Sequence, residues 1–247
     1  MILIQHIPEK DRLERRHGEY MMRLDKFLAD AGLGTRTEVK AMIRQGRVTV
    51  DGTVVKKPEQ KVSSEQDVCA DGTTVRQLGT VVLMLHKPSG YVTSTSDPRD
   101  QTVMELLPAE YQKLFPVGRL DKETEGLLLF TNDGELGHRL TSPRHCVEKE
   151  YYAETDGEVT AEDMKAFSEG IALKDGTMCR PAGLERCEGG CLVTVQEGKY
   201  HQVRRMLASR GKPVKYLRRI REGALTLGTL EKGECRLLTP EEISNLL

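Results

Sequence analysis

The chain has 247 residues, of which 38% are hydrophobic and 30% carry a charge. This balance is typical of a soluble globular protein and excludes a wholly disordered chain, and the length allows one large domain or two unequal ones. The formal net charge is -1, so any surface that binds nucleic acid has to come from basic residues gathered locally.

The apolar runs of the chain are short. The longest, Val81–Leu85 and Leu127–Phe130, fall far below the ~20 residues that a membrane-spanning helix needs. The N-terminal segment is charged from Glu9 to Arg16 and lacks the continuous apolar stretch of a signal peptide. We therefore expect a cytoplasmic protein with no membrane partner, in which residues 1–21 form a poorly ordered extension.

Six cysteines are spread over the chain, and no two of them form a Cys-x-x-Cys pair. The closest two, Cys187 and Cys191, are separated by three residues. This spacing favours neither a zinc site nor the disulfide framework of a small secreted domain, so we expect free thiols and no metal. A zinc or redox role for His145 with Cys146, or for Cys187 with Cys191, is the alternative.

Residues 22–67 have the pattern of a small compact domain. Apolar residues at positions 24, 27, 28 and 31 recur at helical spacing and predict a first helix. Thr35 and Glu38 have the spacing of a capping box, which predicts the start of a second helix. Two short runs rich in valine and threonine surround Asp51-Gly52 and predict a hairpin with a tight turn. The expected order is helix, helix, hairpin.

Basic residues of this domain gather on one face of the second helix. Arg36, Lys40, Arg44 and Arg47 are spaced by three or four residues, which places them on one stripe. Residues 22–61 contain nine basic and five acidic side chains. A solvated helix face is the ordinary explanation, but we favour binding to RNA phosphates, with Arg23 as a further contact.

A polar, glycine-containing segment at 68–79 is expected to link this domain to a larger one at 80–247. The larger part is rich in predicted strands, of which the runs at 81–85 and 126–130 are the most apolar. Further strands are expected near 150–155, 191–196 and 224–227, and helices near 135–141, 161–169 and 201–210. At the C-terminus, Thr239-Pro240 followed by Glu242 predicts a last capped helix.

Two segments of the larger part point to chemistry. Asp121 lies in a polar turn between Arg119 and an apolar run, although a loop aspartate before a strand is usually only a turn residue. The segment Lys199–Arg221 holds nine lysines and arginines and neither aspartate nor glutamate. Such a block is expected to face a negative partner, of which RNA phosphate is the natural one. Arg204 or a neighbour is also placed to pair with the Asp121 carboxylate.

Five sequence blocks resemble a known family in the same order along the chain. The block GRLDKETEGLLLFTNDGEL at 118–136 resembles the signature of the RsuA-type branch of RNA pseudouridine synthases. The other four are HKPSGYVTS at 86–94, TSPRHCVEKEYY at 141–152, EGKYHQVRRM at 197–206 and GECRLLTPEEI at 233–243. Residues 22–67 are similar to the RNA-binding domain named after ribosomal protein S4. The resemblance covers nearly all of the chain from Met22 onward and leaves residues 1–20 unexplained.

The resemblance implies an α+β fold. A small α/β S4-like RNA-binding domain would precede a larger pseudouridine synthase domain, which is built on a mixed, mostly antiparallel sheet with a cleft across it. It also implies a bacterial enzyme that flips a uridine out of RNA, breaks its C1′–N1 bond and rejoins the base through C5. This isomerisation needs no cofactor, because it is redox-neutral and transfers no external group.

The resemblance also assigns roles to single residues. Asp121 would be the catalytic carboxylate, Arg204 its cationic partner, and Tyr151 the aromatic that stacks on the target base. Tyr152 is the alternative for that role, and only one of the two can face the cleft because side chains alternate along a strand. The expected contacts to RNA outside the small domain are Arg119, Lys199 and Arg205.

The expected substrate is ribosomal RNA, free or within an assembling small-subunit particle, and the expected state is a monomer. The blocks at 141–152 and 197–206 resemble the branch that modifies 16S RNA, which we favour. A synthase acting on 23S RNA is one alternative. The other is a non-catalytic S4-type RNA-binding factor associated with the ribosome, which would keep the basic stripe but would not need Asp121, Tyr151 and Arg204 together.

Overall fold

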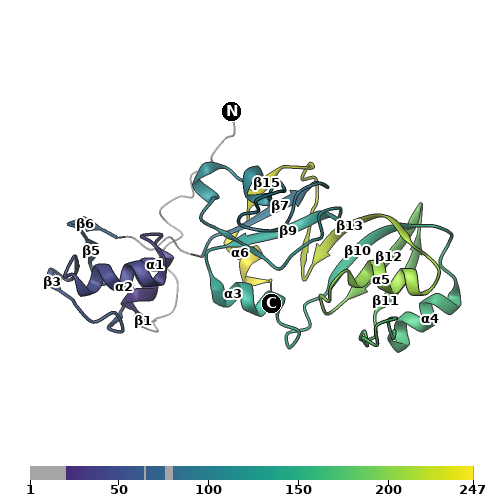
Figure 1. Cartoon of the computed structure of the whole chain (residues 1–247), viewed down its shortest axis with the longest axis horizontal. Coiled ribbons are helices and arrows are strands. Elements are labelled where there is room, and N and C mark those ends of the chain that lie inside the picture. The colour runs from purple at the N-terminus through teal and green to yellow at the C-terminus, as the bar shows by residue number, and fades with distance from the viewer. Residues whose placement is uncertain (1–20, 64, 76–79, 247) are drawn as a thin grey trace. The chain divides into compact units, whose positions relative to one another are not determined.

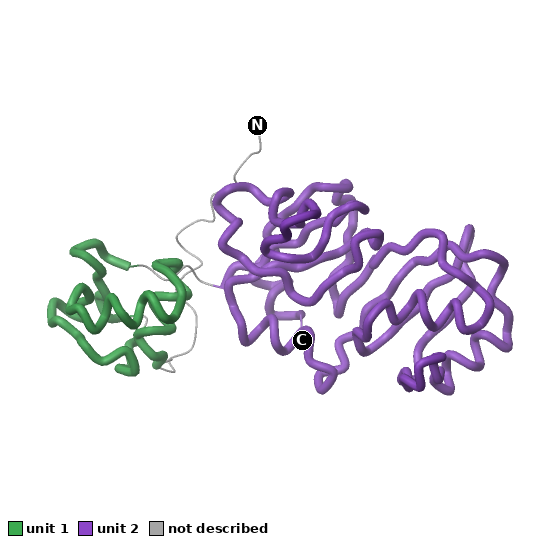
Figure 2. Tube along the Cα trace, viewed as in Figure 1, with its two compact units in different colours: residues 1–79 green, residues 80–247 purple. Residues whose placement is uncertain are grey.

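The computed structural model describes residues 21–63, 65–75 and 80–246. The chain divides into two compact units, one at residues 1–79 and the other at residues 80–247 (Figure 2). Except for Met21, the predicted N-terminal extension at 1–21 lies outside the described residues. None of the helices in the described ranges is long and apolar enough to cross a membrane.

The first unit packs two helices on a small sheet (Figure 1). The helices are α1 (Leu24–Asp30) and α2 (Arg36–Arg44), and Thr35 with Glu38 forms the predicted capping box of α2. The predicted hairpin is confirmed as β2 (Val48–Val50) and β3 (Thr53–Val54). A separate two-stranded pair is formed by β1 (Met22–Arg23) and β4 (Lys61–Val62).

The predicted linker at 68–79 is wrong in its first part. Residues 68–74 form β5 (Val68–Ala70) and β6 (Thr73–Thr74), which complete a sheet of order β3-β2-β5-β6. Val68 is fully buried in the same core as the two helices. Asp71-Gly72 repeats the Asp-Gly turn of the first hairpin, with positive φ at both residues. That turn signal was available in the sequence and extends the folded domain beyond residue 67.

The second unit is built on one mixed sheet in which nine strands are described. Its main order is β11-β12-β10-β13-β9-β7-β15, with β14 paired to β13 and β8 to β9. Among the strand pairs of the described residues, only β13–β9 is parallel, so the expected mostly antiparallel sheet is confirmed. The strands are β7 (Val82–Lys87), β8 (Phe115–Val117), β9 (Glu125–Thr131), β10 (Lys149–Thr155), β11 (Gly183–Cys187), β12 (Gly190–Val195), β13 (Val214–Glu222), β14 (Leu225–Thr226) and β15 (Cys235–Leu237).

Helices cover both faces of this sheet and explain its apolar strands. Alternate residues of β7 and β9 are buried in two different cores, one containing Leu83 and Leu128 and the other containing Met84 and Leu129. Strands buried on both faces read as continuous apolar runs, as these two do. The helices are α3 (Gly134–Thr141), α4 (Ala161–Glu169), α5 (Gln202–Ser209) and α6 (Pro240–Ser244), with short 3-10 helices η2 (Val103–Leu106) and η3 (Ala109–Tyr111).

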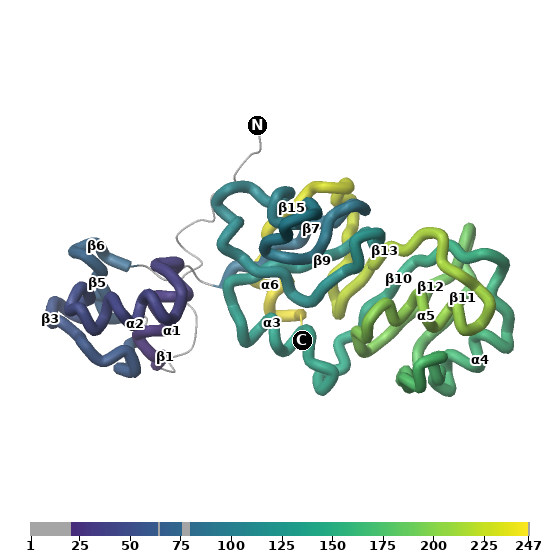
Figure 3. Tube along the Cα trace, in the orientation of Figure 1, coloured from purple at the N-terminus to yellow at the C-terminus, as the bar shows by residue number. Residues whose placement is uncertain are grey.

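Strand β13 joins the two halves of the sheet. It lies between β9 and β10 (Figure 3) and pairs with both. Where β9 meets it, Gly126 has φ of 110°, and a Cβ placed there would lie 2.1 Å from the carbonyl oxygen of Arg219. Only glycine fits this junction, because both the backbone angle and the space exclude a side chain.

Replacing Gly126 with alanine should therefore destabilise the second unit strongly. We expect a loss of unfolding free energy on the order of 3 kcal/mol or more, from strain and from displaced backbone. Gly228→Ala is the matched control, since Gly228 also has positive φ but nothing lies within 4 Å of the added carbon; it should cost ~1 kcal/mol. Thermal unfolding followed by circular dichroism measures both, and equal losses would contradict the close approach of β9 and β13.

Candidate active site

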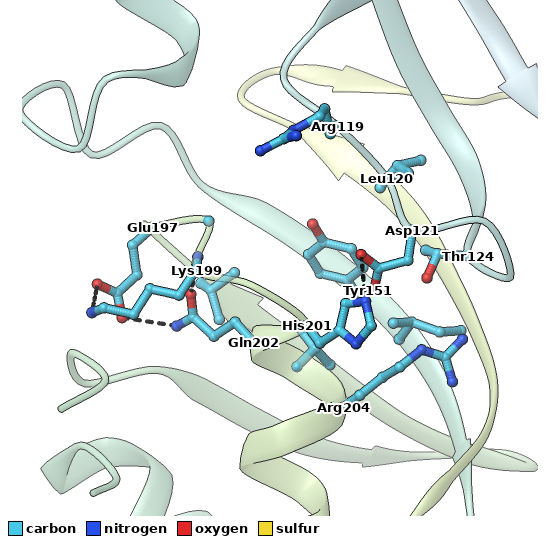
Figure 4. Close-up of a pocket in the computed structure, with 14 residues that line it drawn as sticks. Arg119, Leu120, Asp121, Thr124, Tyr151, Glu197, Lys199, His201, Gln202 and Arg204 are labelled. Carbon is cyan, nitrogen blue, oxygen red and sulfur yellow. Dashed lines mark hydrogen bonds and ion pairs between the residues drawn. The ribbon is translucent and has the colours of Figure 1, made fainter. Parts of the chain in front are cut away.

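A narrow pocket in the second unit opens between the turn that follows β8 and the start of α5. Its volume is about 70 Å³, well below the ~300 Å³ of a typical small-molecule cleft. The polar and aromatic residues that line it are Arg119, Asp121, Thr124, Tyr151, Glu197, Lys199, His201, Gln202 and Arg204 (Figure 4).

The turn that carries Asp121 is fixed at its start by Leu120. The Leu120 side chain is buried in the core beside β7 and β9. Its backbone N–H and carbonyl both bond the Thr93 hydroxyl, at 3.2 and 2.8 Å. The Thr124 N–H then closes the turn on the carbonyl of Asp121, at 3.0 Å. The Asp121 side chain is left one-third exposed at the mouth of the pocket.

A buried lysine holds the same turn from below. Lys87, the last residue of β7, is fully buried, and its Nζ donates to the carbonyls of Pro88, Lys122 and Thr124 at 2.8 to 3.0 Å. Burial lowers the pKa of Lys87 to about 8, and the negative charge of Glu123 acts against that shift. All three protons of the ammonium group are thus matched to acceptors, two of them in the turn of Asp121.

Tyr151 reaches the pocket from strand β10, next to β13 in the sheet. It pairs with Arg219 on β13, whose side chain is 2% exposed and whose Nε donates to the Leu127 carbonyl at 2.7 Å. Burial acts to lower the pKa of the Arg219 guanidinium. The Glu222 carboxylate, 3.2 Å away, acts in the opposite direction, and the pKa of Arg219 is raised overall. Burial raises the pKa of Tyr151, and the charge of Arg219 acts against this.

The neighbouring Tyr152 faces away from the pocket. Its ring contacts Tyr216, with centroids 6.2 Å apart, and the Arg218 guanidinium lies over it at 5.8 Å. Because side chains alternate along a strand, Tyr151 lines the pocket and Tyr152 does not, as the sequence analysis favoured.

His201 provides the direct partner of Asp121. The residue precedes α5 in a left-handed conformation (φ 48°, ψ 35°), and its Nε2 lies 3.4 Å from Asp121 Oδ1. In Figure 4 the imidazole points toward the carboxylate, whereas Arg119 extends away from it. The Tyr200 ring stacks on a face of the His201 imidazole, with ring centroids 3.9 Å apart and 16° between the planes.

The model of the family described as RNA pseudouridylate synthase matches residues 81–209, and the model of the S4 domain matches residues 22–68. The chain belongs to the RNA pseudouridylate synthase family.

Similar proteins extend over almost the whole chain. The ribosomal small subunit pseudouridine synthase A of Escherichia coli is 42% identical over 232 residues, which cover 92% of this chain and 100% of that protein. An uncharacterized RNA pseudouridine synthase of Bacillus subtilis is 41% identical over 231 residues, covering 90% and 97% of the two chains. A crystal structure of a pseudouridylate synthase matches with a TM-score of 0.66 and 36% identity, covering 92% of this chain and 100% of that one.

The predicted ion pair between Asp121 and Arg204 is wrong for this RNA pseudouridine synthase. Arg204 lines the same pocket, but its Nη1 lies 3.5 Å from the Val214 carbonyl, and the side chain paired with Asp121 is His201. The reason is the left-handed residue before α5, which turns the imidazole over the pocket. Arg204, one turn into the helix, leans toward the start of β13.

The block 199–221 contains neither aspartate nor glutamate, yet most of its basic residues have acidic partners in the fold. Six of its nine basic residues pair with carboxylates, four of them with residues of distant segments and two with Glu197 and Glu222, which flank the block. Among the described residues, Arg204, Lys212 and Arg218 have no carboxylate partner, and Arg119 makes neither an ion pair nor a hydrogen bond. The paired residues are Lys199 with Glu197, Arg205 with Asp175, Arg210 with Asp163, Lys215 with Asp156, Arg219 with Glu222, and Arg221 with Glu148 and Glu150.

The S4 domain keeps only part of the predicted basic stripe. Helix α2 ends at Arg44, and Gly46 has positive φ, so Arg47 lies off the helix and pairs with Asp71. Arg23 pairs with Asp25 at 2.9 Å, and Lys40 lies 3.8 Å from the same carboxylate. Arg36 and Arg44 are exposed and pair with no acidic group of the described residues. These two are the cations best placed for an external phosphate.

None of the six cysteines lines this pocket. All six cysteines are free, and no three His, Cys, Asp or Glu side chains in the described ranges cluster as metal ligands. Cys191 is buried, and burial raises the pKa of its thiol to about 11. A thiol held in this way is a poor nucleophile, which argues against the redox alternative for Cys187 and Cys191.

Two residues of the site were missed by the sequence analysis, and both carried a weak signal. Lys87 ends an apolar strand just before a proline, where a charged residue stands out against five buried neighbours. His201 lies within the block at 197–206, but nothing in the sequence shows that it adopts a left-handed backbone. Local propensity does not reveal either contact, because both depend on the tertiary fold.

The buried ammonium of Lys87 gives a pH-dependent stability with a definite sign. Its pKa falls from the usual 10.5 to about 8 in the folded state, so between these values the unfolded chain binds more protons. The unfolding free energy of the second unit should therefore rise with pH relative to Lys87→Met, by about 3 kcal/mol between pH 8 and 10.5. Denaturant unfolding by circular dichroism measures this difference.

Lys174→Met, which removes an exposed lysine from the same unit, controls for the loss of a positive charge. The unfolding free energy of the wild type minus that of Lys87→Met should rise above pH 8. A difference that stays constant or falls would contradict a buried ammonium group with a lowered pKa beneath the turn.

Proposed function

We propose that this enzyme isomerises a uridine to pseudouridine in 16S ribosomal RNA, with Asp121 as the essential carboxylate. The observation that carries the proposal is that Asp121 and Tyr151 line one narrow pocket together with Arg119 and Arg204. The first two come from the loop after β8 and from β10, 30 positions apart in the sequence. A carboxylate, an aromatic ring and cations are what an enzyme needs to act on an extruded base in RNA.

The chemistry assigns a task to each group. The uridine must leave its stack, which costs a few kcal/mol, and a ring such as that of Tyr151 replaces the lost stacking. Asp121 must be ionised to act on the ribose or the base, and positive charge close by favours the ionised form of a carboxylate. His201 contacts the Asp121 carboxylate directly, and Arg204 lines the same pocket.

The choice of 16S RNA rests on two supports. The relatives from Escherichia coli and Yersinia pestis carry the name ribosomal small subunit pseudouridine synthase A. The blocks at 141–152 and 197–206 resemble the same branch. The proposed enzyme is cytoplasmic and monomeric, and takes its RNA free or in an assembling small-subunit particle. A synthase for 23S RNA is the alternative, and the position of the lost pseudouridine distinguishes the two.

Asp121→Asn should abolish pseudouridine formation while leaving the affinity for RNA within about threefold, since the amide has the shape of the carboxylate without its charge. Carbodiimide mapping of ribosomal RNA from a deletion strain names the target uridine, and complementation with each variant tests the residue. Asp156→Asn, which removes an exposed carboxylate paired with Lys215, is the matched control. Restored modification by Asp121→Asn would contradict the proposed mechanism.

The S4 domain gives a prediction about salt. Arg36→Ala and Arg44→Ala should each weaken RNA binding and reduce the slope of log affinity against log salt by about one, the loss expected for one phosphate contact. Arg47→Ala is the control, because Asp71 already occupies its guanidinium. Binding titrations at several salt concentrations measure the slopes. Equal slopes for all three variants and wild type would mean that this helix faces only solvent.

A further inference from the structure

Tyr200 lies between Lys199 and His201, two residues that line the pocket, and its aromatic ring is not explained by the reaction. It is 74% exposed, more than any other large hydrophobic side chain in the described part of the chain. One face of the ring is stacked on the His201 imidazole. An aromatic side chain with a free face in water usually marks a binding surface, because it gains from stacking or burial when a partner arrives.

The segment that presents this ring is held firmly. His201 has the left-handed backbone that residues other than glycine rarely adopt. The carbonyl of Tyr200 accepts from Arg205 Nη1 at 3.3 Å, and the N–H of Lys199 donates to Gln202 Oε1 at 3.0 Å. Gln202 is itself buried and donates to Glu197 at 2.8 Å. A strained backbone kept in place by such a network is typical of a preorganised binding element.

The two rings follow one another from the carboxylate. His201 contacts Asp121 through the Nε2 edge of its imidazole, and Tyr200 stacks on a face of the same imidazole. A base held at Asp121 would therefore have its neighbour in the RNA strand close to the free face of Tyr200. The nearby cations Arg119 and Arg204, which have no acidic partner among the described residues, can follow the phosphates between the two nucleotides.

We propose that Tyr200 and His201 form a stacking platform for the unpaired base that adjoins the target uridine. The platform deepens the proposed function, on which it rests, by adding a second nucleotide to the recognised substrate. Stacking accepts any base, so the platform selects for an unpaired neighbour more than for its identity. A protein partner is the competing occupant of this surface. The apolar side chain of Met178 is 61% exposed, and the Met178 carbonyl accepts a hydrogen bond from Lys199 Nζ, next to Tyr200 in the chain.

The test uses the full-length Asp121→Asn protein, which should bind without reacting, and a 16S RNA fragment that carries 2-aminopurine next to the target uridine. Binding should quench the fluorescence of 2-aminopurine through stacking. Adding Tyr200→Ala should remove the quench and weaken binding about tenfold, whereas Tyr200→Phe should retain both. Met178→Ala is the matched control for the loss of an exposed apolar side chain. In the active enzyme, the Tyr200→Ala defect should appear in KM more than in kcat.

Quenching and affinity that stay unchanged when Tyr200→Ala is added to Asp121→Asn would overturn the platform. A Tyr200→Ala protein that binds RNA normally but no longer binds a protein partner would overturn it as well. Circular dichroism checks that each variant is folded, and the phenylalanine variant separates a stacking loss from a general one. Pseudouridine formation by Asp121→Asn would instead defeat the proposed function while leaving the binding result standing, so the two failures are distinguishable.

Discussion

The ammonium group of Lys87 is buried beneath the turn that carries Asp121, and the pocket depends on this contact. Its three protons meet three carbonyls, so hydrogen bonds offset part of the cost of removing a charge from water, and the lowered pKa reports the part that remains. The result is a turn tied to the end of β7 instead of a loop free to move. A carboxylate that must meet a substrate within a narrow tolerance needs such support, since small displacements cost much of a reaction rate.

The opposite wall of the pocket rests on a second buried cation. Arg219 supports Tyr151 across the β10–β13 pair and is balanced by Glu222, with Lys149 close to the same carboxylate. Breaking such a pair is expensive, because the remaining charge is left buried without a partner. The parallel contact of β13 with β9 at Gly126 then sets the distance between this wall and the turn of Asp121. Two buried lysines and an arginine thus shape a site whose substrate is anionic.

Elements with a local signal were predicted well from the sequence. The capping boxes at Thr35 and Thr239 and the Asp-Gly hairpin carry their own chemistry, and the structure confirms them. Strands β7 and β9 are buried on both faces and so are visible as apolar runs. The central strand β13 was missed because its sequence, VKYLRRIRE, is basic, and only the tertiary fold shows that Arg219 is buried.

The site was predicted in part for the same reason. Asp121, Tyr151 and Arg204 do line one pocket, but the partner of Asp121 is His201, whose backbone angle no local pattern reveals. Four residues of the basic block pair with carboxylates of distant segments, such as Asp163 on α4 and Glu150 on β10, which a count of charges along the chain cannot show. Arg119 remains available for phosphate because no described side chain pairs with it.

The most direct test of the central claim is a crystal structure of Asp121→Asn bound to a 16S RNA fragment that contains the mapped uridine. We predict a single uracil outside the RNA stack, lying against Tyr151 with its ribose next to residue 121 and the turn still bonded to Lys87. An RNA bound with every base stacked, or a flipped base held away from this pocket, would contradict it.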